Sequence, residues 1–165
     1  MADYLTDIEQ VRLLGGLPEN VNTLPDKSFR AALAGAAAEL KKHVGTSKYA
    51  ASLAEITAAR AVLEEGENLE DNADLTAQAR GLREAECNLT MAKMIPRLNM
   101  NYRDTGIQTQ VTTEHGNINN LSVEGVRALI KHYRHECWAA CRSYCETQAL
   151  SGYKQPAYDD AGEEI

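Results

Sequence analysis

Residues 101–120 read NYRDTGIQTQVTTEHGNINN, and this polar stretch separates two long helical patterns. Within it, every second position alternates with polar neighbours at the period of a β-strand; these positions are Ile107, Thr109, Val111 and Thr113. Gly116-Asn117 favours a turn, after which Ile118 and Leu121 predict a second, weaker strand. A small helical domain does not need such an arm to build its core, so we expect the arm to pair with a neighbouring chain. Residues 102–106 are expected to connect the preceding helix to the arm.

Apolar residues at spacings of three and four predict helices on both sides of this arm. One stripe follows Asp26 and stops at Gly45; it consists of Phe29, Leu33, Ala36, Ala37, Leu40 and Val44. A shorter stripe consists of Leu53, Ile56, Ala59 and Leu63. A heptad pattern that Pro96 should kink or end consists of Leu75, Leu82 and Leu89, with Ala85 and Ala92 between them. The last stripe consists of Val126, Ile130, Tyr133, Cys137, Cys141 and Tyr144.

Polar residues ahead of these stripes predict where the helices begin. Thr6 is expected to cap a short first helix with Glu9 bonding back to it, and Asp74 and Ser122 are expected to cap later helices. Together the elements predict a mainly α fold, a small antiparallel helix bundle with a protruding β-like arm and a flexible C-terminal tail. We expect one helical domain over residues 1–150, with the arm at 101–121, and a tail over 151–165.

Composition narrows the function classes. The chain has 165 residues and a net charge of −7, which argues against duplex nucleic acid as a direct ligand because DNA-binding surfaces cluster Lys and Arg. No run approaches the roughly 20 apolar residues of a membrane span. The start, Met1-Ala2-Asp3, does not resemble a secretion signal, so we expect a protein made in the cytosol with reduced cysteines.

Cysteine and histidine residues near the C-terminus raise a metal or catalytic alternative. Cys137, Cys141 and Cys145 are spaced by four, and His132 and His135 lie nearby in the sequence. Structural zinc sites usually pair two such ligands on a turn with a second, distant pair, whereas here the other cysteine is Cys87 alone. Small buried thiols in a helical stripe account better for the spacing. We therefore expect no catalytic residue, no cofactor and no metal.

The order of elements resembles the head-to-tail connector (adaptor) proteins of long-tailed bacteriophages. The most similar stretch consists of Ala85-Glu86-Cys87-Asn88-Leu89, Ile95-Pro96-Arg97-Leu98 and Asn101-Tyr102-Arg103-Asp104-Thr105-Gly106-Ile107. The arm and the closing helix extend the likeness to about Leu150. The acidic loop 64–74 is not matched to the family.

The resemblance implies a structural, non-enzymatic virion protein, made in the host cytoplasm and placed in the neck at the head-tail junction. Such adaptors form rings, commonly of twelve subunits, between the portal protein and a stopper or tail-completion protein. DNA passes through their channel without specific binding, and no membrane is involved. Inter-subunit contacts would come from the arm residues Ile107, Thr109, Val111, Thr113 and Ile118. Docking onto the portal would come from the tail residues Tyr153, Pro156, Tyr158 and Ile165.

Other functions stay open at this point. A stopper or tail-completion protein of a phage would also be small. A helical module could bind a partner by adding the arm as a strand to the partner's sheet. A small metal protein would use the cysteines and histidines of the last helix.

Overall fold

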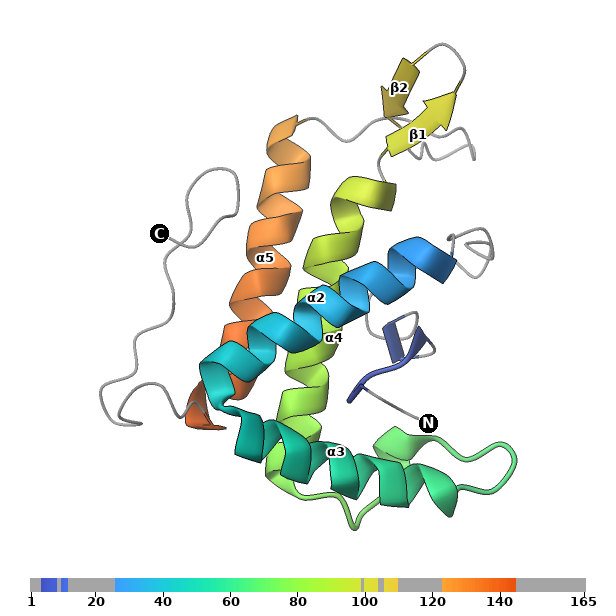
Figure 1. Ribbon diagram of the computed structural model, residues 1–165, viewed down its shortest axis with the longest axis vertical. Coiled ribbons are helices and arrows are strands. Elements are labelled where there is room, and N and C mark those ends of the chain that lie inside the picture. The colour runs from blue at the N-terminus through green and yellow to red at the C-terminus, as the bar shows by residue number, and fades with distance from the viewer. Residues whose placement is uncertain are drawn as a thin grey trace.

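The computed structural model describes residues 4–8, 10–11, 26–98, 100–103, 106–109 and 123–144. Its elements are α2 (Asp26–Val44), α3 (Thr46–Ala61), the 3₁₀ turn η1 (Leu69–Asp71), α4 (Ala77–Leu98), β1 (Met100–Arg103), β2 (Gly106–Thr109), α5 (Val123–Cys141) and the 3₁₀ turn η2 (Arg142–Tyr144). Residues 8, 10 and 11 are also helical. The described part is mainly helical, which confirms the predicted fold class (Figure 1). None of the helices described is long and apolar enough to cross a membrane.

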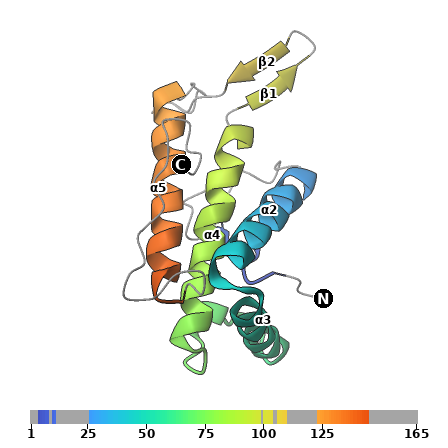
Figure 2. The same cartoon turned by 60° about the vertical axis from the view of Figure 1, so that its left-hand side comes forward.

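Helix α4 is the central element of the bundle. Helix α5 lies beside it in the opposite direction, α2 crosses it, and α3 lies across its first turns (Figures 1 and 2). The heptad residues predicted to face a partner are all buried: Leu75, Leu82, Ala85, Leu89 and Ala92. Because α4 has neighbours on several sides, residues between the heptad positions are buried too, among them the polar side chains of Arg83, Glu86 and Thr90.

Local backbone chemistry sets the helix boundaries. Gly45 ends α2 as predicted; its φ of 90° and ψ of 147° lie in a region that is almost reserved for glycine. Helix α3 starts immediately afterwards, at Thr46. The cap predicted at Asp74 is wrong, because α4 begins at Ala77 and the Thr76 hydroxyl accepts a hydrogen bond from the Ala79 N–H at 3.2 Å. Pro96 lies in the last turn of α4, which ends at Leu98.

The predicted cap at Thr6 is also wrong. The Asp7 carboxylate accepts the Gln10 N–H at 2.9 Å, so Asp7 takes the capping role. Thr6 donates instead from its hydroxyl to Gln10 Oε1 at 2.5 Å. Glu9 and Ser122 lie outside the described residues.

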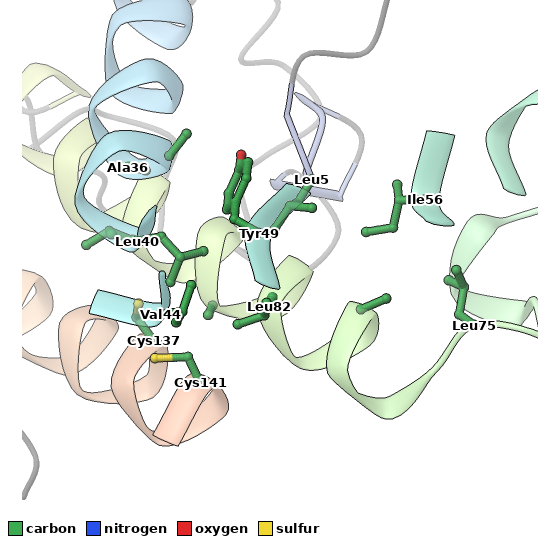
Figure 3. Packing of buried hydrophobic residues seen from close by; sticks show 14 of the residues in the cluster. Leu5, Ala36, Leu40, Val44, Tyr49, Ile56, Leu75, Leu82, Cys137 and Cys141 are labelled. Atoms are coloured by element: carbon green, nitrogen blue, oxygen red, sulfur yellow. The ribbon is translucent and has the colours of Figure 1, made fainter. Parts of the chain in front are cut away.

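Two apolar clusters form the core. The larger cluster joins α2, α3, α4 and α5 and includes Leu40, Ile56, Leu82 and Cys137 (Figure 3). Leu5 from the start of the chain lies in this cluster near Tyr49 and Ile56 and is fully buried. The smaller cluster joins α2 and α4 to the N-terminal residues and consists of Val11, Phe29, Ala32, Leu33, Cys87, Met91 and Met94. The predicted apolar stripe of α2 is buried throughout.

A charged cluster fixes the positions of α2, α4 and α5 relative to one another. Glu39 of α2 pairs with Lys93 of α4 at 2.7 Å and with Arg134 of α5 at 2.5 Å. Burial alone would raise the pKa of Glu39, but the hydrogen bonds and charges of Lys93 and Arg134 outweigh it, so this pKa is lowered. The carboxylate therefore stabilises the fold above its unfolded-state pKa, and that contribution is lost as the pH falls.

Gly81 permits the close approach of α4 to the end of α5, and this yields a stability prediction. A Cβ at Gly81 would lie 2.7 Å from the Tyr144 ring and 3.2 Å from the Ala140 carbonyl oxygen. We expect Gly81→Ala to lower the free energy of unfolding by about 1–2 kcal/mol, because overpacking outweighs the gain in helix propensity. Urea unfolding followed by circular dichroism measures this.

Gly35→Ala is the matched control for this prediction. Gly35 also lies inside a helix, but its added Cβ would meet only the side chain of Lys93, 3.3 Å from Cδ. We expect this variant to be unchanged or to gain up to about 1 kcal/mol. Equal effects of the two variants would show that the contact with Tyr144 does not limit the packing.

Candidate functional site

The predicted arm begins as a β-hairpin at the end of α4. Only Asn99 separates Leu98 of α4 from Met100 of β1, so the hairpin continues from the helix end and projects beyond it (Figures 1 and 2). Strands β1 and β2 pair antiparallel, with Arg103 opposite Gly106 and Met100 opposite Thr109. Two residues, Asp104 and Thr105, connect them.

The register determines which backbone groups of β2 point outward. Antiparallel strands alternate between pairs that exchange hydrogen bonds and pairs whose N–H and C=O groups point away from each other. A two-residue connection makes its flanking pair, Arg103 and Gly106, a bonded pair, so the next pair, Tyr102 and Ile107, points outward. By the same alternation Thr109 points its backbone outward. No third strand pairs with these groups among the described residues.

This geometry corrects the predicted arm. Residues 102–106 were expected to be a connection, but Met100–Arg103 is itself a strand, and it pairs with β2 inside the same chain. Among the described residues the partner of β2 precedes it in the sequence. The second strand predicted around Ile118 and Leu121 lies outside the described residues. Of the predicted arm residues, Ile107 and Thr109 lie in β2, whereas Val111, Thr113 and Ile118 lie outside the described residues. The tail residues Tyr153, Pro156, Tyr158 and Ile165 also lie outside them.

A second constellation holds the start of the chain, which we call the N-terminal segment (residues 4–8, 10 and 11). The guanidinium of Arg60 in α3 donates to the carbonyl oxygens of Tyr4 and Leu5, both at 2.9 Å. Arg83 in α4 donates from Nε to the same Leu5 carbonyl at 3.1 Å. Both guanidinium groups also reach Asp7 Oδ2, at 3.2 and 3.3 Å. Two arginines thus bind the backbone and the Asp7 carboxylate of this segment.

Glu86 binds the same segment from inside the bundle. Its side chain is fully buried, and its Oε1 accepts the Thr6 N–H at 3.0 Å. Its Oε2 accepts the Tyr49 hydroxyl at 2.5 Å. Next to it, the Cys87 thiol donates to the Gln10 carbonyl at 3.8 Å. We call the side chains of Tyr49, Arg60, Arg83, Glu86 and Cys87 the α3–α4 docking surface.

The electrostatics of this surface depend on burial. Burial raises the pKa of Glu86 to about 7, although the hydrogen bonds from Thr6 and Tyr49 and the charge of Arg60 act in the opposite direction. Burial and the nearby Glu86 carboxylate raise the pKa of Tyr49, so its hydroxyl stays protonated and donates. Burial also lowers the pKa of Arg60, against the charge of Asp7. Asp7 and Glu86 balance the two arginines, so the assembled site is neutral when Glu86 is ionised.

The cysteines of α5 lie in the core. Cys137 and Cys141 are free and fully buried, in agreement with the interpretation of a packed helical stripe. Burial, followed by the hydrogen bond with Cys141, raises the pKa of the Cys137 thiol, which disfavours a thiolate nucleophile. His132 and His135 are exposed, and Cys145 lies outside the described residues. Within the described ranges no group of three His, Cys, Asp or Glu side chains is placed to hold a metal ion.

Sequence reasoning missed the α3–α4 docking surface. Arg83 and Glu86 lie between the heptad leucines and read as solvent-facing residues of an amphipathic helix. The one available signal was their position beside Cys87 on a helix that is otherwise rich in apolar and small residues. Nothing in the pattern indicated that the first residues of the chain would cover them.

A family model matches most of the chain. The model of a family described as a family of unknown function (DUF6712) matches residues 40–163. No curated protein and no solved structure matches the chain. The matched range contains the hairpin and the whole α3–α4 docking surface, whereas the N-terminal segment lies before it.

The raised pKa of Glu86 predicts a pH dependence of stability. A carboxyl with a pKa of about 7 in the folded state and about 4.5 in the unfolded chain binds more protons when folded. Its contribution is complete below about pH 4.5 and is lost as the pH rises through 7, a change on the order of 3 kcal/mol at most. Glu86→Gln should flatten the fall in unfolding free energy between pH 5 and 7, measured by urea unfolding at several pH values.

Glu39→Gln is the control, because the pKa of Glu39 is shifted in the opposite direction. That variant should leave the fall between pH 5 and 7 in place and should weaken the loss of stability below pH 4.5. Parallel curves for the native chain and Glu86→Gln would exclude Glu86 as the titrating group.

Proposed function

The chain belongs to the DUF6712 family, and we propose that it is a structural subunit of a bacteriophage head-to-tail connector. In this proposal the protein is an adaptor. It forms a ring, commonly of twelve copies, between the portal protein of the filled capsid and a stopper or tail-completion protein. Its place is the neck of the virion, and its role is mechanical, with no catalytic step.

The observation that carries this proposal is the hairpin at the end of α4. The larger core cluster is formed by residues of α2, α3, α4 and α5, and the strand pair lies beyond the helix ends (Figures 1 and 2). A two-stranded hairpin alone is marginal in water, and a third strand makes it considerably more stable. The position and the marginal size of the hairpin both favour a partner outside the bundle.

A neighbouring subunit supplies that partner in the ring. The outward N–H and C=O groups of Ile107 and Thr109 form the edge that a strand of the next subunit would pair with. Main-chain pairing of this kind needs no particular side chains, so every subunit of a ring can make the same contact with the next. The predicted arm residues Val111, Thr113 and Ile118 would extend this edge.

The remaining parts of the proposal follow from charge and from the tail. A subunit with a net charge of −7 offers no general attraction to DNA, so a genome can slide through a channel made of such subunits. The tail residues Tyr153, Pro156, Tyr158 and Ile165 are proposed to dock onto the portal.

A specific test uses proline at the outward position of β2. Ile107→Pro removes an N–H that points away from β1, so the hairpin can persist while the outer edge loses a donor. We expect the helical circular dichroism to be retained and ring assembly to fall at least tenfold, measured by sedimentation velocity and electron microscopy of the purified protein with and without the portal.

Ile107→Ala is the matched control, since it keeps the backbone donor, and it should still form rings. Normal rings from Ile107→Pro would exclude the outer edge of β2 as the contact. If the native chain gave a one-to-one complex with a partner and no ring, the result would favour a partner-binding module that adds this strand to the partner's sheet.

A further inference from the structure

The N-terminal segment is bound to the bundle in the way that proteins bind a short peptide. Guanidinium groups of Arg60 and Arg83 bind its carbonyl oxygens, and the Glu86 carboxylate binds one of its N–H groups. Two apolar side chains, Leu5 and Val11, are fully buried as anchors in different clusters. These contacts are all between atoms distant in the sequence, so none of them requires that the segment and the docking surface belong to one molecule.

Removing the N-terminal segment from the α3–α4 docking surface would destabilise the bundle. Without the segment, Glu86 and Arg83 would lose the partners that compensate their burial, and Leu5 would leave a gap in the larger cluster. Covering the surface with a segment that carries these groups therefore stabilises each subunit, and the same contacts form whichever copy supplies the segment.

The chain between the segment and α2 is long enough to allow another origin. Residues 12–25 join Val11 to Asp26 and include Gly15, Gly16, Pro18 and Pro25. Fifteen peptide steps can span up to about 50 Å when extended. A compact domain of this length has a radius of gyration of about 15 Å, so the segment can reach the docking surface of an adjacent copy.

We propose that residues 4–11 are exchanged between copies, so that in the assembled ring the α3–α4 docking surface of each subunit holds the N-terminal segment of its neighbour. This inference rests on the proposed function, because it names a second contact of the same ring. Exchange replaces each contact within a chain by the identical contact between chains, and it links the subunits without a new interface. The exchanged segment brings Leu5, Asp7 and Val11 into the neighbour.

Disulfide trapping tests the exchange in the full-length protein. Val11 lies in the same buried cluster as Cys87, and the Cys87 thiol contacts the neighbouring Gln10 carbonyl. In a Val11→Cys variant that also carries Cys145→Ser, oxidation should join Cys87 to the new thiol. We expect covalent dimers and longer ladders from assembled rings on denaturing gels, and intramolecular bonds alone from the separated monomer. Intramolecular bonds alone from the ring would overturn the exchange.

The same variant with Cys87→Ser is the control and should give no ladder; a ladder that persists in it would arise from other thiols and would count against the exchange. If the native chain forms no ring at all, the proposed function fails; rings that give intramolecular bonds alone exclude only the exchange.

If oxidation forms no disulfide at all, a mixing experiment tests the exchange. Asp7→Arg and Arg60→Asp each place like charges together within one chain, since Arg60 and Arg83 both contact Asp7. An exchanged segment would restore an opposite pair in a mixed ring, because the arginine introduced in one variant then meets the aspartate introduced in the other. We expect the mixture to assemble at least tenfold better than either variant alone. No improvement on mixing would overturn the proposal.

Discussion

The backbone near the N-terminus needs hydrogen-bond partners from the bundle, and this need determines which ionisable side chains lie inside it. The first residues of the chain lie against α3 and α4, and their N–H and C=O groups cannot all be paired within a single helical turn. Helices α3 and α4 supply partners for them: the Arg60 and Arg83 guanidinium groups bind carbonyl oxygens, and the Glu86 carboxylate binds an N–H. This requirement explains why a helix that is buried on several sides carries ionisable residues in its middle. An apolar residue at position 86 would leave the Thr6 N–H without a partner inside the core.

The same backbone requirement arises at the C-terminal end of α4. There the chain leaves the helix as β1, and β2 pairs with one edge of it. In the middle of α4 the irregular backbone is paired with buried charged side chains, whereas beyond the helix end β2 has an outer edge that no strand of the described part pairs with. One helix thus has a closed polar contact in its middle and a strand pair beyond its end. In the proposed ring both would contact neighbouring subunits.

Apolar spacing was a sound guide to the helices, because burial of one stripe is what stabilises each of them. The stripe from Phe29 to Val44 and the heptad through Leu82 and Leu89 are buried as the spacing predicts. The same reasoning gave the wrong environment for Glu86. Periodicity assigns polar residues to the solvent-facing side of a helix, and it gives no information about a distant segment that covers them. The caps were misplaced by one or two positions because several adjacent residues, such as Asp74 and Thr76, have equally suitable side chains. The hairpin register was missed because Tyr102-Arg103-Asp104-Thr105-Gly106 has the composition of a turn, and β1, which includes the first two of these residues, is too short to show a period.

Residue 99 alone separates the last turn of α4 from β1. The strand pair is therefore joined by a very short link to a helix of 22 residues that is packed along much of its length. A binding element carried on a long tether must surrender a wide range of orientations when it docks, and that loss of entropy weakens association. The short link to α4 restricts the orientations of this strand pair before it binds. A contact made through the strand pair can therefore be specific even though few residues take part in it.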